Sequence, residues 1–288
     1  MRFENRTPDE SVNYGIEHPL KEFAWLLGGV LGGLFILSLL LGYFAGELAA
    51  RLPYRYEKNL AAEFGFRSGN GQPDAQAAAI ERSLNRLAAR LVPHMALPDD
   101  MRITVHYDDS PVVNAYATLG GNVVIFKGLL AGMPDENTLA MVLAHEIAHA
   151  RLRHPVRSLG RGVAFAIVLS AINAGMGHSV ASNVLGNAGG LTLLKYSRDQ
   201  ESDADAEALA AVVAAYRHAG GSSEIFQVLE HAAGSEPGRV TMLSTHPLSQ
   251  DRIDAVAELA KQRGWALDGP RTPLDAVLAG VHADEKPH

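Results

Sequence analysis

One stretch of the sequence has no charged side chain over 24 residues, from Phe23 to Gly46, and Glu22 and Glu47 bracket it. A helix needs about 20 predominantly apolar residues to cross the hydrocarbon core of a bilayer. Glycine pairs at 28–29 and 32–33 would weaken a soluble helix but are common in membrane-spanning ones. The stretch therefore predicts one membrane-spanning helix at residues 23–46.

A buried core helix and a cleaved signal peptide are the alternatives. The preceding residues 1–22 are long for a signal-peptide leader and contain acidic as well as basic side chains, so we expect a retained single-pass anchor. The two sides of the span carry equal numbers of nearby basic residues: Arg2, Arg6 and Lys21 before it, and Arg51, Arg55 and Lys58 after it. The positive-inside rule therefore does not decide the orientation of the span. We expect a bacterial inner membrane, with the rest of the chain in the periplasm.

Composition narrows the function classes. The net charge of −7 and the absence of a basic block exclude nucleic acid as the main partner. Cysteine is absent, so a metal site here must be built from His, Asp and Glu. The expected organisation is a polar tail (1–22), the anchor (23–46), a juxtamembrane linker (47–72), one domain (73–265) and a C-terminal tail (266–288).

Periodicity and turn residues predict the elements of that domain. Helices are expected at 73–92, from a cap at Asp135 or Asn137 to His154, at 198–219 and at 249–263. Residues 102–107 alternate like a strand, and 114–126 form two strands about the Gly120-Gly121 turn. The predicted fold class is α+β, mainly helical with a small, mostly antiparallel sheet.

The sequence HEIAH, from His145 to His149, lies within one of the predicted helices. Residues four apart share a helix face, so both imidazoles can point at one ion, with Glu146 beside it as a base. A hydrolytic zinc site has three protein ligands and an open position for water. One further ligand is therefore expected from elsewhere.

Glu201 and Asp205 are candidates for that ligand, since they also lie four apart on a predicted helix. One carboxylate could bind zinc, and the other could accept a hydrogen bond from a ligand histidine. The alternative is a solvated acidic helix N-terminus favoured by the helix dipole. Beside a helix that needs a carboxylate ligand, we favour the metal site.

Four motifs in order give this chain a family resemblance: NAYATLGG with VVIFKGLL, HEIAH, ESDAD and STHPLSQDRI. The chain resembles, over roughly residues 75–260, the membrane-associated gluzincin zinc metallopeptidases of the CAAX prenyl endopeptidase, HtpX and Oma-type proteases. It differs from the prenyl protease and HtpX in having one clear N-terminal span instead of several.

The resemblance implies a zincin-like fold, one Zn²⁺ per chain and the following roles. Glu201 is the third ligand after His145 and His149, Asp205 supports the ligands, His246 faces the substrate, and Arg252 holds the loop of His246. NAYATLGG corresponds to an edge strand, so Asn114, Ala115, Tyr116 and Ala117 are expected to bind an extended substrate by strand addition.

The predicted function is a membrane-anchored zinc-dependent metalloendopeptidase that cleaves protein substrates, with Glu146 as general base. Misfolded or membrane-associated proteins are the expected substrates. Two alternatives are a non-catalytic membrane-tethered zinc-binding chaperone or adaptor, and a hydrolase of a small amide or lipid.

Two further segments carry expectations. The apolar insertion 162–194 is too short for two full spans, which need about 40 residues. We expect a helix-and-loop flap on the membrane or over the cleft, with a shallow re-entrant loop as the alternative. His178 within it is expected to be solvated, and His154 to be a surface or helix-end residue.

Overall fold

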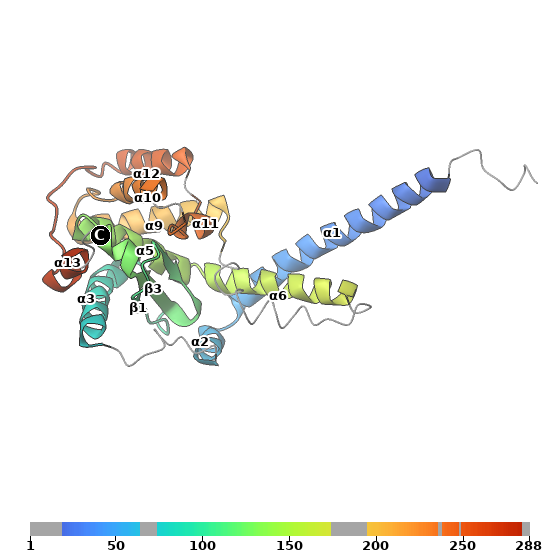
Figure 1. Cartoon of the computed structure of the whole chain (residues 1–288), viewed down its shortest axis with the longest axis horizontal. Coiled ribbons are helices and arrows are strands. Elements are labelled where there is room, and N and C mark those ends of the chain that lie inside the picture. Colours follow the sequence, from blue (N-terminus) through green and yellow to red (C-terminus); the bar gives the residue numbers. More distant parts are fainter. Residues whose placement is uncertain (1–18, 64–73, 174–194, 236–237, 248, 284–288) are drawn as a thin grey trace, which may run out of the picture.

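The computed structural model describes residues 19–63, 74–235, 238–247 and 249–283, except 174–194. A compact helical body holds the sheet, and one long helix extends away from it (Figure 1). The domain's helices are α3 (Ala75–Leu91), α4 (Lys127–Ala131), α5 (Glu136–Arg151), α9 (Arg198–Tyr216), α10 (Glu224–Ser235), α11 (Met242–Thr245), α12 (Gln250–Gln262) and α13 (Ala276–Ala283).

The sheet has three strands, β1 (Thr104–Asp108), β2 (Ala115–Ala117) and β3 (Asn122–Phe126), in the order β1-β3-β2. The expected hairpin is present: β2 pairs antiparallel with β3, and Gly120 and Gly121 take the positive φ angles of the turn. However, β1 pairs parallel with β3. The sheet is therefore mixed, and the prediction of a mostly antiparallel sheet was wrong, because β3 inserts between the two preceding strands.

Helix α5 lies at the centre of the core. Every residue from Asn137 to Ala150 is buried, under α9 on one side and the sheet on another. Its N-terminus is fixed by Asp135, whose carboxylate accepts a hydrogen bond from the Thr138 amide at 2.8 Å. Burial all round holds the side chains of this helix in fixed positions.

The apolar segment forms α1 (Pro19–Arg51), a helix about 50 Å long at 1.5 Å per residue. Among the described residues, it is the one helix long and apolar enough to cross a membrane, with a mean hydropathy of 2.2 over its most apolar part. Large apolar side chains such as Trp25 and Phe35 are exposed along it.

Helix α6 (His154–Asn173) runs beside α1 rather than over the rest of the domain (Figure 1). A Cβ on Gly160 would lie 2.7 Å from the Ala45 carbonyl oxygen, and Arg157 pairs with Glu47 at 3.3 Å. The described part of the expected flap is thus a helix along the anchor. His178 lies outside the described residues.

The stretch expected as a linker contains a helix, α2 (Tyr54–Glu63), docked on the β2–β3 turn. Glu57 on α2 is only 2% exposed, accepts a hydrogen bond from the Gly120 amide at 3.0 Å and pairs with Arg153 at 2.9 Å. One buried carboxylate therefore joins the juxtamembrane helix, the sheet turn and the end of α5.

Candidate metal centre

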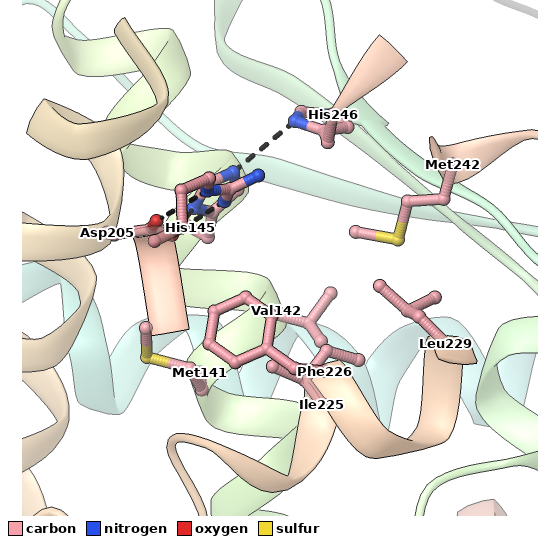
Figure 2. A pocket seen from close by; sticks show the side chains of 10 residues that line it. Met141, Val142, His145, Asp205, Ile225, Phe226, Leu229, Met242 and His246 are labelled. Atoms are coloured by element: carbon pink, nitrogen blue, oxygen red, sulfur yellow. Dashed lines mark hydrogen bonds and ion pairs between the residues drawn. The ribbon is translucent and has the colours of Figure 1, made fainter. Parts of the chain in front are cut away.

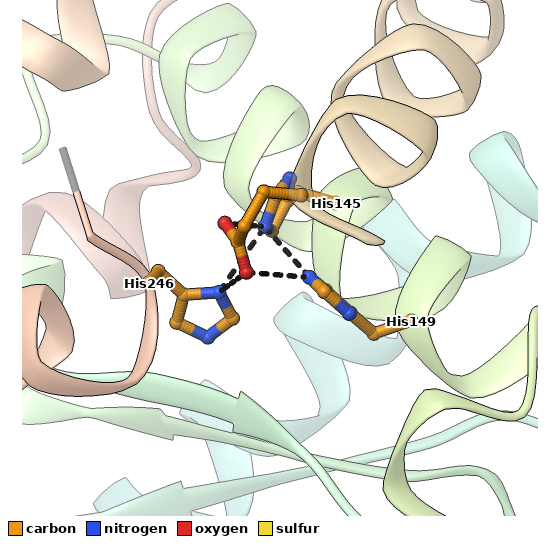
Figure 3. Close-up of side chains that lie close together, drawn as sticks. His145, His149 and His246 are labelled. Atoms are coloured by element: carbon orange, nitrogen blue, oxygen red, sulfur yellow. Dashed lines mark hydrogen bonds and ion pairs between the residues drawn. The ribbon is translucent and has the colours of Figure 1, made fainter. Parts of the chain in front are cut away.

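The two histidines of HEIAH point to one side of α5, as the helix spacing predicts. Their rings are 4.6 Å apart, and the Nε2 atoms of His145 and His149 are 3.0 Å apart (Figure 3). Both side chains are buried.

Helix α9 brings the acidic side chains to this pair. It begins with a capping box in which Ser197 and Gln200 exchange side-chain and backbone hydrogen bonds. One turn later, Glu201 lies with its carboxylate oxygens 3.6 Å from His145 Nε2 and 3.5 Å from His149 Nε2. The predicted meeting of the two helices is therefore present.

His246, directly after α11, completes a cluster of four. Its Nδ1 lies 3.0 Å from Glu201 Oε1 and 3.3 Å from His145 Nε2 (Figure 3). One potential ligand atom from each of His145, His149, Glu201 and His246 lies within 4.8 Å of all the others.

These separations fit a zinc ion. Zinc–nitrogen and zinc–oxygen bonds of about 2.0–2.2 Å place tetrahedral ligands about 3.3–3.6 Å apart, and the measured distances are close to this. The cluster also attracts positive charge: burial alone would lower the pKa of His145, but its hydrogen bonds to Asp205 and Glu201 raise that pKa to about 10. A divalent cation would satisfy the same carboxylates.

Each ligand histidine is oriented through its outer nitrogen. His145 Nδ1 donates to Asp205 at 2.9 Å, and Arg252 binds the same carboxylate through two nitrogens at 2.8 and 2.9 Å. Burial would raise the pKa of Asp205, but His145 and Arg252 hold it below its ordinary value. Arg252 also donates to the Pro247 carbonyl at 3.0 Å, which ties down the loop of His246.

His154 was expected to be a surface or helix-end residue; it begins α6, but the surface alternative was wrong. It is buried, and its Nδ1 lies 2.8 Å from His149 Nδ1. The helix ends at Arg151, and Arg153 takes a positive φ of 62°, which turns His154 back toward the cluster. Burial and the nearby Arg157 lower the pKa of His154 to about 3, so this ring is neutral at physiological pH.

Tyr196, which the sequence reasoning missed, stacks on His149 with ring centroids 4.0 Å apart. Its hydroxyl is buried without a hydrogen-bond partner, and burial followed by the charges of Glu146 and Glu201 raises its pKa well above 10. No local pattern marks an aromatic residue as lying above a ligand 47 residues earlier.

Glu146 lies beside the cluster, on the side of β2. Its Oε2 accepts a hydrogen bond from the Ala117 amide at 2.8 Å, while its Oε1 is buried without a hydrogen-bond partner. That oxygen lies 3.6 Å from His246 Nε2, another buried atom without a hydrogen-bond partner. A carboxylate and an imidazole therefore face one another across the site.

The predicted substrate strand lies next to these groups. The Ala117 amide is used by Glu146, and Val113 on the same edge is bonded to Arg239 and Met242. Between them lies Ala115, which is fully buried. A substrate strand would have to displace the residues that cover Ala115.

A small cavity adjoins His145 (Figure 2). Its volume of about 30 Å³ accommodates one or two water-sized groups. Its lining is mostly apolar and comes from α5, α10 and α11, as in Met141, Val142, Phe226 and Met242.

Two histidines and a glutamate on one helix, with a carboxylate from a second helix, define a gluzincin-type metallopeptidase site. Residues 75–260 match peptidase family M48, and the chain belongs to that family. The expected family, the mainly helical metallopeptidase fold and the cluster for one zinc ion are confirmed.

Among its relatives, mitochondrial metalloendopeptidase OMA1 of Schizosaccharomyces pombe is 30% identical over 62% of this chain and 51% of its own. A putative beta-barrel assembly-enhancing protease of Vibrio cholerae is 30% identical over 75% of this chain and 48% of its own. Metalloprotease YcaL of Escherichia coli is 36% identical over 32% of this chain and 37% of its own. The chain thus spans about half the length of the first two relatives.

Proposed function

We propose that this protein is a membrane-anchored zinc-dependent metalloendopeptidase that hydrolyses peptide bonds of protein substrates. The observation that carries the proposal is the buried cluster of His145, His149 and Glu201, with Glu146 beside it. A closed structural zinc site usually has four ligands and is rich in cysteine, which this chain lacks. The cluster thus favours catalysis over the chaperone or adaptor alternative.

His145, His149 and Glu201 would hold the zinc ion, with Asp205, Arg252 and His154 orienting them. When bound there, zinc supplies a Lewis acid and lowers the pKa of water from 15.7 to about 7.

Side chains of the protein perform the proton transfers and stabilise the developing negative charge. Glu146 takes the proton of the attacking water through its unpartnered oxygen, then passes it to the leaving amine. His246 donates from Nε2 to the carbonyl oxygen as negative charge develops.

The substrate chain would lie along the edge of β2 at Asn114–Ala117, displacing the residues that cover Ala115 and binding through the backbone groups that this exposes. Backbone recognition suits unfolded or extended protein segments, which favours a peptidase over a hydrolase of small amides or lipids. The names of the relatives are consistent with a role in membrane protein quality control.

A retained anchor is favoured over a cleaved signal peptide by the packing of α1. Ser38, Gly42 and Gly46 of α1 are buried, and Gly46 lies against Arg157 and Arg161 of α6. Removal of α1 would uncover this face. We place the protein in a bacterial inner membrane with its domain in the periplasm; detection by mass spectrometry of peptides from α1 in the protein isolated from the membrane fraction would test retention.

Glu146→Gln tests the peptidase proposal. The full-length variant in detergent should keep one zinc per chain but lose casein hydrolysis, because an amide cannot accept the proton. Wild-type protein with and without a chelator is the control. Casein cleavage by the variant at the wild-type rate would refute the role of Glu146, and zinc binding without any hydrolysis by the wild type would favour the adaptor.

A further inference from the structure

The contact between α1 and α6 is antiparallel and close. Gly46 of α1 lies against Arg157 and Arg161, and Gly160 of α6 lies against Ala45 and Ala49. Advancing along α6 therefore means moving back along α1, away from the catalytic domain (Figure 1).

Along α6, charged side chains give way to an uncharged, apolar segment. Arg157 and Arg161 lie level with the end of the apolar segment of α1, and residues 162–173 carry no charge. Val163, Phe165 and Ile167 are 37%, 53% and 64% exposed. Val163 and Ile167 share one side of the helix and Phe165 lies on the opposite side, so the described residues leave apolar side chains of α6 uncovered on two sides, next to the equally exposed apolar surface of α1.

We propose that α6 enters the bilayer beside α1 from Gly162 onward, with lipid acyl chains against its exposed side chains, and that this holds the metal centre at the membrane surface to act on segments emerging from that membrane. This deepens the proposed function and rests on it for the substrate class. The 12 uncharged residues of α6 span about 18 Å, so the described helix reaches past the middle of a core about 30 Å thick without crossing it.

The distance of the metal centre from the bilayer surface follows from the position of the first residue of α6. His154 is its first residue and contacts His149 at 2.8 Å. Gly162 follows His154 by eight residues, about 12 Å along the helix. An extended chain covers about 3.3 Å per residue, so a peptide bond about four or more residues from the bilayer surface can reach the cluster.

Lipid is favoured over a protein partner because the exposed apolar side chains lie on two sides of α6 and continue the surface of a helix that is itself long and apolar enough to cross a membrane. The two arginines lie at the boundary and keep their charges out of the apolar part of the helix, since Arg157 pairs with Glu47 and Arg161 donates to Ser158.

The absence of native cysteine allows a direct test. Full-length Glu146→Gln protein carrying Ile167→Cys or Phe165→Cys is labelled with an environment-sensitive fluorophore in vesicles of phosphatidylethanolamine and phosphatidylglycerol. Leu267→Cys, an exposed apolar position of the catalytic domain, is the matched control. Both α6 labels should shift to the blue and be quenched by doxyl-labelled lipid, and the control should not.

Labels on α6 that respond like the control overturn the proposal, as does a blue shift without lipid quenching, which would indicate a protein partner or a second copy. The readout needs no activity, so it stands even if the peptidase proposal fails.

The substrate class is tested with Ile167→Asp and the control Leu267→Asp in the otherwise wild-type chain. A reporter anchored by one span, with its cleavage site four to eight residues from the membrane, should be cut at least tenfold more slowly by Ile167→Asp. Casein hydrolysis should be unchanged. Equal losses on both substrates, or no loss on the reporter, refute the inference; no cleavage of either by the wild type refutes the proposed function instead.

Discussion

His154 determines which nitrogen of His149 faces the cluster. The Nδ1 atoms of the two rings are 2.8 Å apart. When His149 Nδ1 carries the proton and donates it to His154 Nδ1, the lone pair of His149 Nε2 is free to bind the metal. The contact is made by a neutral ring, because the pKa of His154 is lowered to about 3, mainly by burial.

His154→Ala should therefore weaken zinc binding. Removing a partner of a ligand histidine typically costs about 10–100-fold in metal affinity or activity. Competition with a chromogenic chelator would measure this, with exposed His94→Ala as control. An unchanged zinc affinity would contradict the role of His154.

His154 also predicts a loss of stability in mild acid. Its folded pKa, about 3, lies below the unfolded value of about 6.5, so the unfolded chain binds a proton that the folded chain does not. Its contribution is complete above pH 6.5 and decreases as the pH falls toward 3. In the presence of chelator, the melting temperature of the wild type should fall more steeply from pH 6.5 to 4 than that of His154→Ala; parallel curves would contradict the assignment.

His246→Ala separates two roles for this side chain. As a donor to the developing oxyanion, its loss should lower kcat by about 10²–10³ and leave zinc affinity nearly unchanged. A large fall in zinc affinity would instead identify Nδ1 as a fourth ligand, which its distance of 3.0 Å from Glu201 Oε1 permits. Steady-state kinetics and zinc titration on one preparation would decide between them.

At the scale of elements, an ion pair attaches α2 to the turn that follows α5. Arg153 is 16% exposed at its side chain and Glu57 2%, and Arg153→Met leaves this carboxylate buried without its cation. Breaking a buried pair on one side costs about 3–5 kcal/mol. Burial already raises the pKa of Glu57, so protonation would relieve part of that cost.

Urea unfolding in detergent would measure the Arg153→Met effect. The matched control is Arg86→Met, since Arg86 is 63% exposed and its pair with Asp275 should be worth at most about 1 kcal/mol. Equal effects of the two substitutions would contradict the importance of the α2 attachment.

The sequence was most informative where the chemistry is local. Helix periodicity alone was enough to assign His145, Glu146 and His149. The two glycines of the turn were enough to predict the hairpin. Glu201 and Asp205 share one helix face, so periodicity could not distinguish ligand from support; the resemblance did.

Contacts between distant segments were missed. His154 follows His149 by five residues and would point elsewhere on a continuous helix; the turn at Arg153 brings it back. Likewise, the partners of Glu57 lie 63 and 96 residues along the chain, and the parallel β1–β3 pair depends on where β3 inserts. The domain boundaries remain predictions.

At the scale of the whole molecule, the anchor and the domain are not independent parts. A fragment beginning at Leu52 would expose the face of α6 that packs on α1, which includes Gly160, in addition to Phe165 and Ile167. We expect this fragment to self-associate without detergent, as measured by light scattering after gel filtration. Phe165→Lys with Ile167→Lys should reduce the association, and a monomeric unsubstituted fragment would contradict the expectation.

Glu201 follows His149 by 52 residues. Between them, α6 extends away from the catalytic domain. An ion held by both residues closes this excursion into a ring, much as a cross-link would. Like a cross-link, the bound ion would restrict the unfolded chain between these two residues, so we expect the zinc-loaded protein to unfold at a higher temperature than the zinc-free protein.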